Sequence, residues 1–199
     1  NVLKIYDFQG NETKQMLWLT LELCDNSLVE EISNLDSNMA LEYFSQICEG
    51  VKTLYCDFEI YNYYLKPDNI FIKDKTAKIS ILEQIKNMKG SLNLFYKKSC
   101  DQLNFLPPEL VDMPDIDQSE YGEKSLVWAL GINFYQMLTK NIHPFFKGIT
   151  FNKLNERTLR KKILDEQTNP NFNEITKNIN FLKILSGCLQ KSPENRLNL

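Results

Sequence analysis

The clearest pattern in this chain of 199 residues is the helical spacing of its apolar side chains. Between residues 38 and 55 they recur every three or four positions (Ala40, Phe44, Ile47, Cys48, Val51, Leu54 and Tyr55), which predicts a long amphipathic helix. Residues 123–139 are apolar on nearly every side, which predicts a helix buried inside the fold. A third stretch, residues 178–190, predicts another helix with one apolar face.

The other apolar stretches are short and predict strands. Alternating or continuous apolar residues favour strands at 2–8, 17–23, 59–62, 70–72 and 77–82, with a polar turn between the first two. Two short helices are predicted at 27–33 and 158–166. Residues 83–106 show no periodicity, and a loop of that length in a compact domain is usually functional or mobile.

Composition and charge narrow the class of protein. A hydrophobic fraction of 43% is typical of a folded globular chain. A net charge of −3 gives no reason to expect nucleic acid as a partner, and no apolar run is long enough to cross a membrane. The five cysteines are scattered without metal-ligand spacing, so we expect free thiols in the cytoplasm or the nucleus.

Residues 62–69 read Asn-Tyr-Tyr-Leu-Lys-Pro-Asp-Asn. The second half matches the Leu-Lys-Pro-x-Asn of a protein kinase catalytic loop, and Pro107-Pro108-Glu109, Val127-Trp128-Ala129-Leu130-Gly131 and Pro193-Glu194-Asn195-Arg196 follow in the order of that family. The chain therefore resembles a Ser/Thr-type protein kinase domain over nearly all its length. The resemblance implies an α+β fold, mainly the α-helical C-lobe at 26–199, with the last two strands and hinge of the N-lobe at 1–25.

The resemblance fails at the catalytic positions. Tyr64 stands where the family has its base aspartate, and a phenol is protonated at neutral pH. The metal-binding aspartate corresponds to Ile81, which has no oxygen to offer a cation. Asp68 occupies the variable position of the motif and Glu83 stands two residues late, so neither is expected to substitute. Only Asn69 remains of the family's metal ligands, and we expect no metal site.

Other family features are changed or missing. Lys66, which in Ser/Thr kinases steadies the transferred phosphate, is kept, although here it can equally be a lysine that braces the loop. Tyr63 replaces the arginine that receives an activation-loop phosphate, and Leu126 replaces the aspartate that holds the catalytic-loop backbone. The sequence opens on Asn1 with no Gly-rich loop or lysine strand, so we expect a domain truncated in its N-terminal lobe.

The resemblance also implies binding and structural positions. A possible nucleotide slot of adenine size is expected at the hinge, from Leu21, Glu22, Cys24 and Phe71. Glu109 and Arg196 match a buried ion pair of the family, so we expect a bidentate contact between them.

Two further groups of residues have open interpretations. A protein partner can dock on the helix after the buried one, through Leu159, Arg160, Lys161 and Ile163; alternatively, this basic cluster is a solvated face. His143 is the only histidine, and we interpret it as a packing residue rather than a catalytic one.

Three functional hypotheses follow from these residues. The favoured one is a degenerate, pseudokinase-like domain that uses neither ATP nor magnesium and serves as a scaffold or an allosteric binding module. The alternative is a divergent active Ser/Thr protein kinase, dependent on ATP and magnesium, whose N-lobe lies outside this chain. The third is a gene fragment with no selected function. Turnover of Mg-ATP would favour the second hypothesis, and failure to fold would favour the third.

Overall fold

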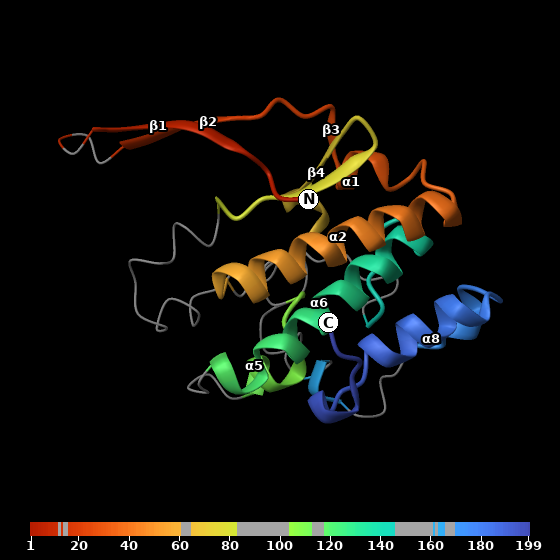
Figure 1. Cartoon of the computed structure of the whole chain (residues 1–199). Coiled ribbons are helices and arrows are strands. Elements are labelled where there is room, and N and C mark those ends of the chain that lie inside the picture. The colour runs from red at the N-terminus through yellow and green to blue at the C-terminus, as the bar shows by residue number, and fades with distance from the viewer. Residues whose placement is uncertain are drawn as a thin grey trace.

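The computed structural model describes residues 1–11, 13, 16–60, 65–82, 104–112, 118–145, 161, 163–165 and 170–199. Helices dominate: α1 (Leu28–Glu31), α2 (Ser37–Phe58), α5 (Pro108–Asp112), α6 (Gln118–Thr139) and α8 (Ile179–Cys188). They form one body, with small antiparallel sheets along one side of it (Figure 1). This arrangement confirms the α+β, mainly helical fold. None of the helices in the described ranges is long and apolar enough to cross a bilayer.

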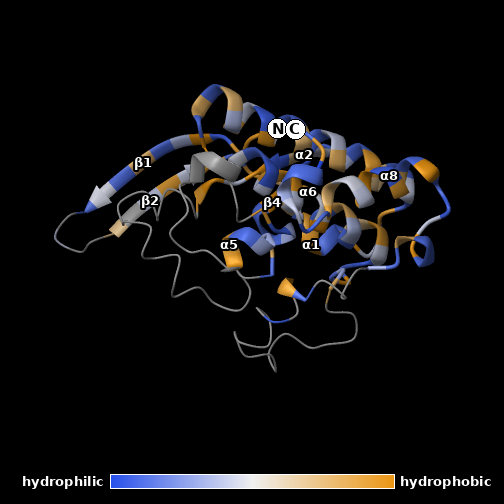
Figure 2. Ribbon diagram, turned by 90° about the horizontal axis from the view of Figure 1, so that it is seen from below, coloured by the Kyte–Doolittle hydropathy of each residue, from blue (hydrophilic) through white to orange (hydrophobic). Residues whose placement is uncertain are grey.

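Helix α2 forms because its apolar spacing is bracketed by two caps. At its start the Asp36 carboxylate accepts hydrogen bonds from the backbone N–H groups of Asn38 (2.8 Å) and Met39 (2.9 Å). At its end Glu59 adopts a left-handed conformation (φ 53°) that closes the last turn. Hydrophilic and hydrophobic segments alternate along it (Figure 2). The strand predicted at 59–62 is wrong at its start, because Glu59 ends the helix; residues 61–64 lie outside the described residues.

Helix α6 lies between α2 and α8 and is the centre of the core. Its residues 125–137 are all buried, which confirms the prediction from its apolar surface, although it begins at Gln118 rather than at residue 123. Phe134 joins the three helices: its ring lies 4.5 Å from that of Phe44 on α2 and 5.4 Å from that of Phe181 on α8. A segment that is bonded to α6 is therefore bonded to the close-packed core of the domain.

Two small sheets lie on the other side of α2. Strands β1 (Ile5–Asn11) and β2 (Met16–Leu21) form an antiparallel hairpin that extends away from the helices (Figure 1). Strands β3 (Asn26–Ser27), β4 (Ile70–Lys73) and β5 (Thr76–Ile79) form the second sheet. β5 is shorter than the predicted strand at 77–82, and the two-residue β3 was not predicted.

The predicted strand at 2–8 divides between these two sheets. The N–H of Leu3 donates to the carbonyl of Ile79 (2.9 Å), and the N–H of Ile79 donates to the carbonyl of Asn1 (2.8 Å), so the first residues pair with β5. Leu3 is buried against the helical body, whereas Phe8 on the hairpin is 70% exposed. Apolar alternation continues through both parts, so it could not locate the division.

Among the described residues there are also three single turns of 3-10 helix: η1 (Pro67–Asn69), η4 (Phe172–Glu174) and η5 (Pro193–Asn195). Helix α8 occupies most of the predicted helix at 178–190. Of the short helix predicted at 158–166, residues 161, 163 and 164 are helical, and most of the remainder lies outside the described residues.

Candidate functional site

Backbone hydrogen bonds hold the catalytic-type loop at Lys66, Pro67 and Asn69. Pro67 opens η1, whose preset φ suits the first position of a helical turn. The Asn69 N–H donates to the Lys66 carbonyl (2.9 Å), the Ile70 N–H donates to the Pro67 carbonyl, and the Asn69 carbonyl accepts from the Ser80 N–H (2.8 Å). Tyr64 and the two residues before it lie outside the described residues.

The residues at the family's metal positions do not fit a magnesium ion. Ile81 is partly buried and packs against the apolar core, and it offers no oxygen to a hard cation. Asn69 contributes a neutral amide only. Within the described ranges, no group of three His, Cys, Asp or Glu side chains is close enough together to hold a metal. The chemistry of the donors, one amide beside an isoleucine, therefore argues against a magnesium–nucleotide site.

A hollow of about 420 Å³ lies at the hinge. It is lined by Cys24, Asp25, Asn26, Ser27, Val29, Glu30, Asp68 and Phe71. Two of the four residues expected in the nucleotide slot, Cys24 and Phe71, are therefore brought together. The lining is more polar than the apolar slot that the sequence predicts. Burial, followed by the nearby Glu22 charge, raises the pKa of the Cys24 thiol, so this thiol stays protonated at neutral pH.

Glu22, expected in the slot, has another role. Its side chain is only 2% exposed, and it forms ion pairs with Lys78 (3.1 Å) and Lys73 (3.6 Å). It also accepts a hydrogen bond from the backbone N–H of Lys4 (2.7 Å). Burial alone would raise the pKa of this carboxyl, but the Lys4 N–H and the Lys78 ammonium outweigh it and lower the pKa. Glu22 therefore ties the hinge to β4 and β5, and Leu21, which pairs with Ile5 in the hairpin, is likewise absent from the lining.

A second hollow, of about 270 Å³, lies on the other side of the loop. It is lined by Lys66, Pro67, Asp68, Asn104, Phe105, Gln136, Asn141 and His143. The side-chain oxygens of Asn104 and Gln136 are buried and have no hydrogen-bond partner in the described part of the chain. Asp68 lines both hollows, whereas Lys66 and Pro67 line only the second one.

His143, which lines the second hollow, is a neutral packing residue, as its sequence context indicated. Its Nδ1 accepts the Phe145 N–H (3.2 Å), so Nε2 carries the hydrogen and donates to the Asn104 carbonyl (2.8 Å). Burial lowers the pKa of His143 to about 4, although the hydrogen bond to Asn104 acts in the opposite direction. An uncharged imidazole of this kind fixes the backbone of Asn104 and does not titrate near neutral pH.

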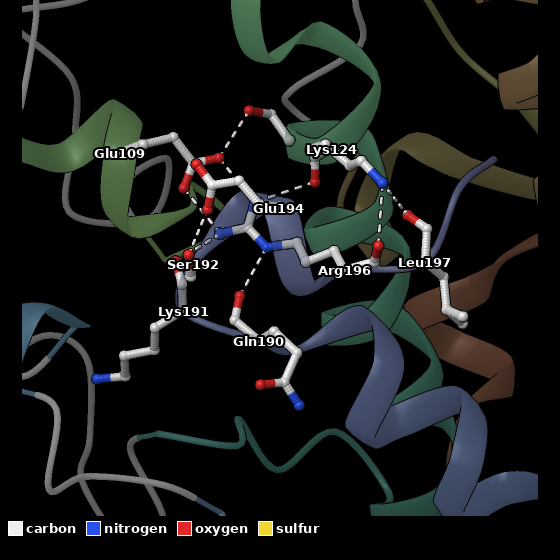
Figure 3. Close-up of polar contacts among 9 residues, drawn as sticks. Glu109, Lys124, Gln190, Lys191, Ser192, Glu194, Arg196 and Leu197 are labelled. Atoms are coloured by element: carbon white, nitrogen blue, oxygen red, sulfur yellow. Dashed lines mark hydrogen bonds and ion pairs between the residues drawn. The ribbon is translucent and has the colours of Figure 1, made fainter.

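Glu109 and Arg196, expected to pair, are brought together by α5 and the C-terminal segment (Figure 3). Arg196 Nη1 and Nη2 donate to the two carboxylate oxygens of Glu109 at 2.7 and 2.8 Å. The two side chains are 0% and 9% exposed, and the guanidinium lies 5.0 Å from the centre of the Trp128 ring. The pair therefore connects α5 to the C-terminal segment across 87 positions of sequence.

The expected docking patch is only partly described. Leu159 and Arg160 lie outside the described residues, and Lys161 is exposed. Ile163, by contrast, is 1% exposed and belongs to the core, so it must be removed from the patch. The Lys191 ammonium donates to the Ile163 carbonyl (2.8 Å), which holds this segment against the helical body.

Sequence reasoning missed three amides near the loop: Asn104, Gln136 and Asn133. The last two lie on α6, within its buried and largely apolar stretch from residue 125 to residue 137. A buried amide is costly unless it is hydrogen-bonded. Polar residues inside an otherwise apolar helix therefore indicate that α6 also forms hydrogen bonds with buried polar groups.

Comparison with known proteins identifies what this architecture is similar to. The family model described as "Protein kinase domain" matches residues 1–199. "Hormonally up-regulated neu tumor-associated kinase" of Mus musculus is 28% identical over 207 residues, covering 100% of this chain and 27% of its own length. "Probable serine/threonine-protein kinase HSL1" of Saccharomyces cerevisiae is 28% identical over 203 residues, covering 99% of this chain and 12% of its own length.

A third relative, "Serine/threonine-protein kinase CHK1" of Saccharomyces cerevisiae, is 25% identical over 147 residues, which cover 70% of this chain and 27% of its own length. The chain thus spans about a quarter or less of the length of these curated relatives.

Proposed function

The chain belongs to the protein kinase family, and from this premise we propose that it is a pseudokinase-like member that transfers no phosphate and acts as a binding module, either a scaffold or an allosteric partner. The observation that carries the proposal is Ile81, an apolar side chain packed on the core where the family places its metal-binding carboxylate. Without that carboxylate, magnesium and the phosphates of ATP cannot be held in line for transfer.

The base position supports the same conclusion. General-base help is typically worth about 10²- to 10⁴-fold, and magnesium clamping with phosphate positioning supplies most of the remaining acceleration. Tyr64 is a poor base, because a phenol keeps its proton at neutral pH. Of the catalytic positions, only Lys66 and Asn69 retain the family's residue types. The contributions of the general base and of the magnesium clamp are therefore both lost.

The binding role is supported by what remains ordered. The Glu109–Arg196 pair joins α5 to the C-terminal segment, and Asp68 lines both hollows. The second hollow also carries the buried amide oxygens of Asn104 and Gln136, which have no hydrogen-bond partner in the described part of the chain. The hinge hollow is large enough for weak, metal-independent nucleotide binding. We further propose a protein partner at the segment around Arg160 and Lys161, and a location in the cytoplasm or nucleus.

Incorporation of radiolabelled phosphate from Mg-ATP into a generic protein substrate tests this proposal. The matched control is the Lys66→Ala/Asn69→Ala double variant, which removes the two retained family residues. We expect equal incorporation by the chain and the control, and we expect Tyr64→Asp alone to recover nothing because Ile81 still leaves the metal unheld. Incorporation by the chain above that of the control would overturn the proposal.

A divergent active Ser/Thr protein kinase is the second candidate. It is favoured by the η1 turn, which keeps Lys66 and Asn69 at its two ends, and by the relatives named as serine/threonine-protein kinases. The same assay decides between the two. A functionless fragment, the third hypothesis, would show no cooperative unfolding transition in denaturant.

A further inference from the structure

Helix α6 contacts the catalytic-type loop through a residue that the sequence did not point to. The Nδ2 of Asn133 donates to the carbonyl of Leu65 (2.8 Å), the first described residue of the loop. The same nitrogen also donates to the carbonyl of Ala129 (2.8 Å), one turn earlier in the helix. An amide nitrogen carries two hydrogens, so both donors of Asn133 are used.

Burial makes the contact with Leu65 an obligatory one. Asn133 and Leu65 are both 0% exposed, so water cannot replace the amide. A buried carbonyl left without a donor, or a buried amide left without an acceptor, costs free energy that neither residue recovers elsewhere. The Oδ1 of Asn133 has no partner in the described part of the chain, so its two N–H groups carry the interaction. This explains an asparagine within an otherwise apolar helix.

The position of Asn133 relates it to Leu126, which replaces the aspartate of the kinase family. Seven positions separate the two, and at about 3.6 residues per turn this places them roughly 20° apart on the same face of α6. Leu126 is completely buried and has no polar group to offer the loop. Asn133 therefore offers the loop a polar contact two turns further along the same face of α6 than Leu126, and in this contact an amide donates to a loop carbonyl.

We propose that Asn133 is a positioning residue that holds the loop at Leu65 onto α6, and with it Lys66, Pro67 and Asp68, which line the second hollow. Because α6 is the buried centre of the core, this bond joins the start of the loop to a close-packed element. The inference goes beyond the proposed function and holds whether or not the chain transfers phosphate.

Hydrogen exchange resolved at individual amides tests the proposal on the whole chain. Three N–H groups report on the loop, those of Asn69, Ile70 and Ser80, because each is bonded to a loop carbonyl. In Asn133→Leu we expect their exchange to become about 10- to 100-fold faster, the effect of one lost buried hydrogen bond, while exchange in α2 stays unchanged.

The matched control is Thr139→Val. The Thr139 hydroxyl lies within hydrogen-bond distance of two carbonyls, those of Tyr135 (2.8 Å) and Ile142 (3.1 Å), and its single hydrogen is shared between them, so Thr139→Val also removes a side-chain donor from α6. We expect no change at the three loop amides. An equal rise in α2 and the loop for Asn133→Leu, or no rise in the loop, would overturn the positioning role.

A second variant keeps the test decisive if Asn133→Leu fails to fold. Asn133→Asp has the same size, but when ionised its carboxylate has no hydrogen to donate to Leu65, and burial raises the pKa of this carboxyl. Loop protection relative to α2 should therefore fall as pH rises and the carboxyl loses its proton, and return on acidification, when the protonated carboxyl can donate. If the ratio of loop protection to α2 protection does not change with pH, Asn133 does not act by positioning the loop. Loss of protection in both the loop and α2 in both variants would show that Asn133 supports the whole fold instead.

Discussion

The substitution Glu109→Gln removes a buried negative charge while leaving the shape of the side chain almost unchanged. Its partner Arg196 uses all its N–H groups in this structure. Besides the two bonds to Glu109, they donate to the carbonyls of Gln190 (2.7 Å), Lys124 (3.0 Å) and Lys191 (3.0 Å). The guanidinium therefore cannot turn towards another acceptor when the carboxylate is neutralised.

The expected loss follows from this geometry. Breaking a buried ion pair from one side costs about 3–5 kcal/mol, because the remaining charge is left buried and uncompensated. Glutamine can still accept one hydrogen bond, but its amide hydrogens then face those of the guanidinium. For a domain of this size, the loss corresponds to a fall in Tm of roughly 6–20 °C.

Guanidinium chloride unfolding, followed by circular dichroism and by tryptophan fluorescence, measures this loss. Trp128 is a local probe because it lies against the guanidinium. The control is Glu194→Gln, which neutralises an exposed glutamate that accepts a hydrogen bond from Ser192. We expect the control to unfold like the unchanged chain. Equal midpoints for Glu109→Gln and Glu194→Gln would refute the account of the buried pair.

Two further predictions concern the histidine and the helix packing. The pKa of His143 is about 4 in the fold and about 6.5 when unfolded, so between these values only the unfolded chain binds the proton, and the free energy of unfolding should fall by about 3 kcal/mol as pH decreases from 6.5 to 4. His143→Gln should flatten the curve of urea stability against pH in that interval, and an unchanged curve would contradict the assignment. In Gly131→Ala the new Cβ would lie 2.6 Å from the Cβ of Cys188, so we expect a loss of about 1–3 kcal/mol in thermal unfolding. Gly10→Ala, where nothing lies within 4 Å, is its control, and equal Tm values for the two variants would contradict the close packing.

The sequence by itself determined the features that repeat along one element. The apolar spacing over residues 38–55 located α2, and the uniform apolarity over 123–139 showed that α6 is buried. Both predictions were possible because the spacing of apolar residues within a helix shows which of its faces is buried. The resemblance to kinases added the Glu109–Arg196 contact, which no local pattern carries. Short strands were located less well, since a few alternating residues do not identify their partner.

Only the tertiary structure decided which distant groups meet. The lysines of β4 and β5 neutralise Glu22 and remove it from the expected slot, and the packing of its segment buries Ile163. Asn133 bonds the loop carbonyl of Leu65, a contact across 68 positions that appears only when α6 is seated against the loop. Each of these outcomes depends on which side chains and backbone groups the closed core brings together and removes from water. That is a property of the closed core and not of any one stretch of sequence.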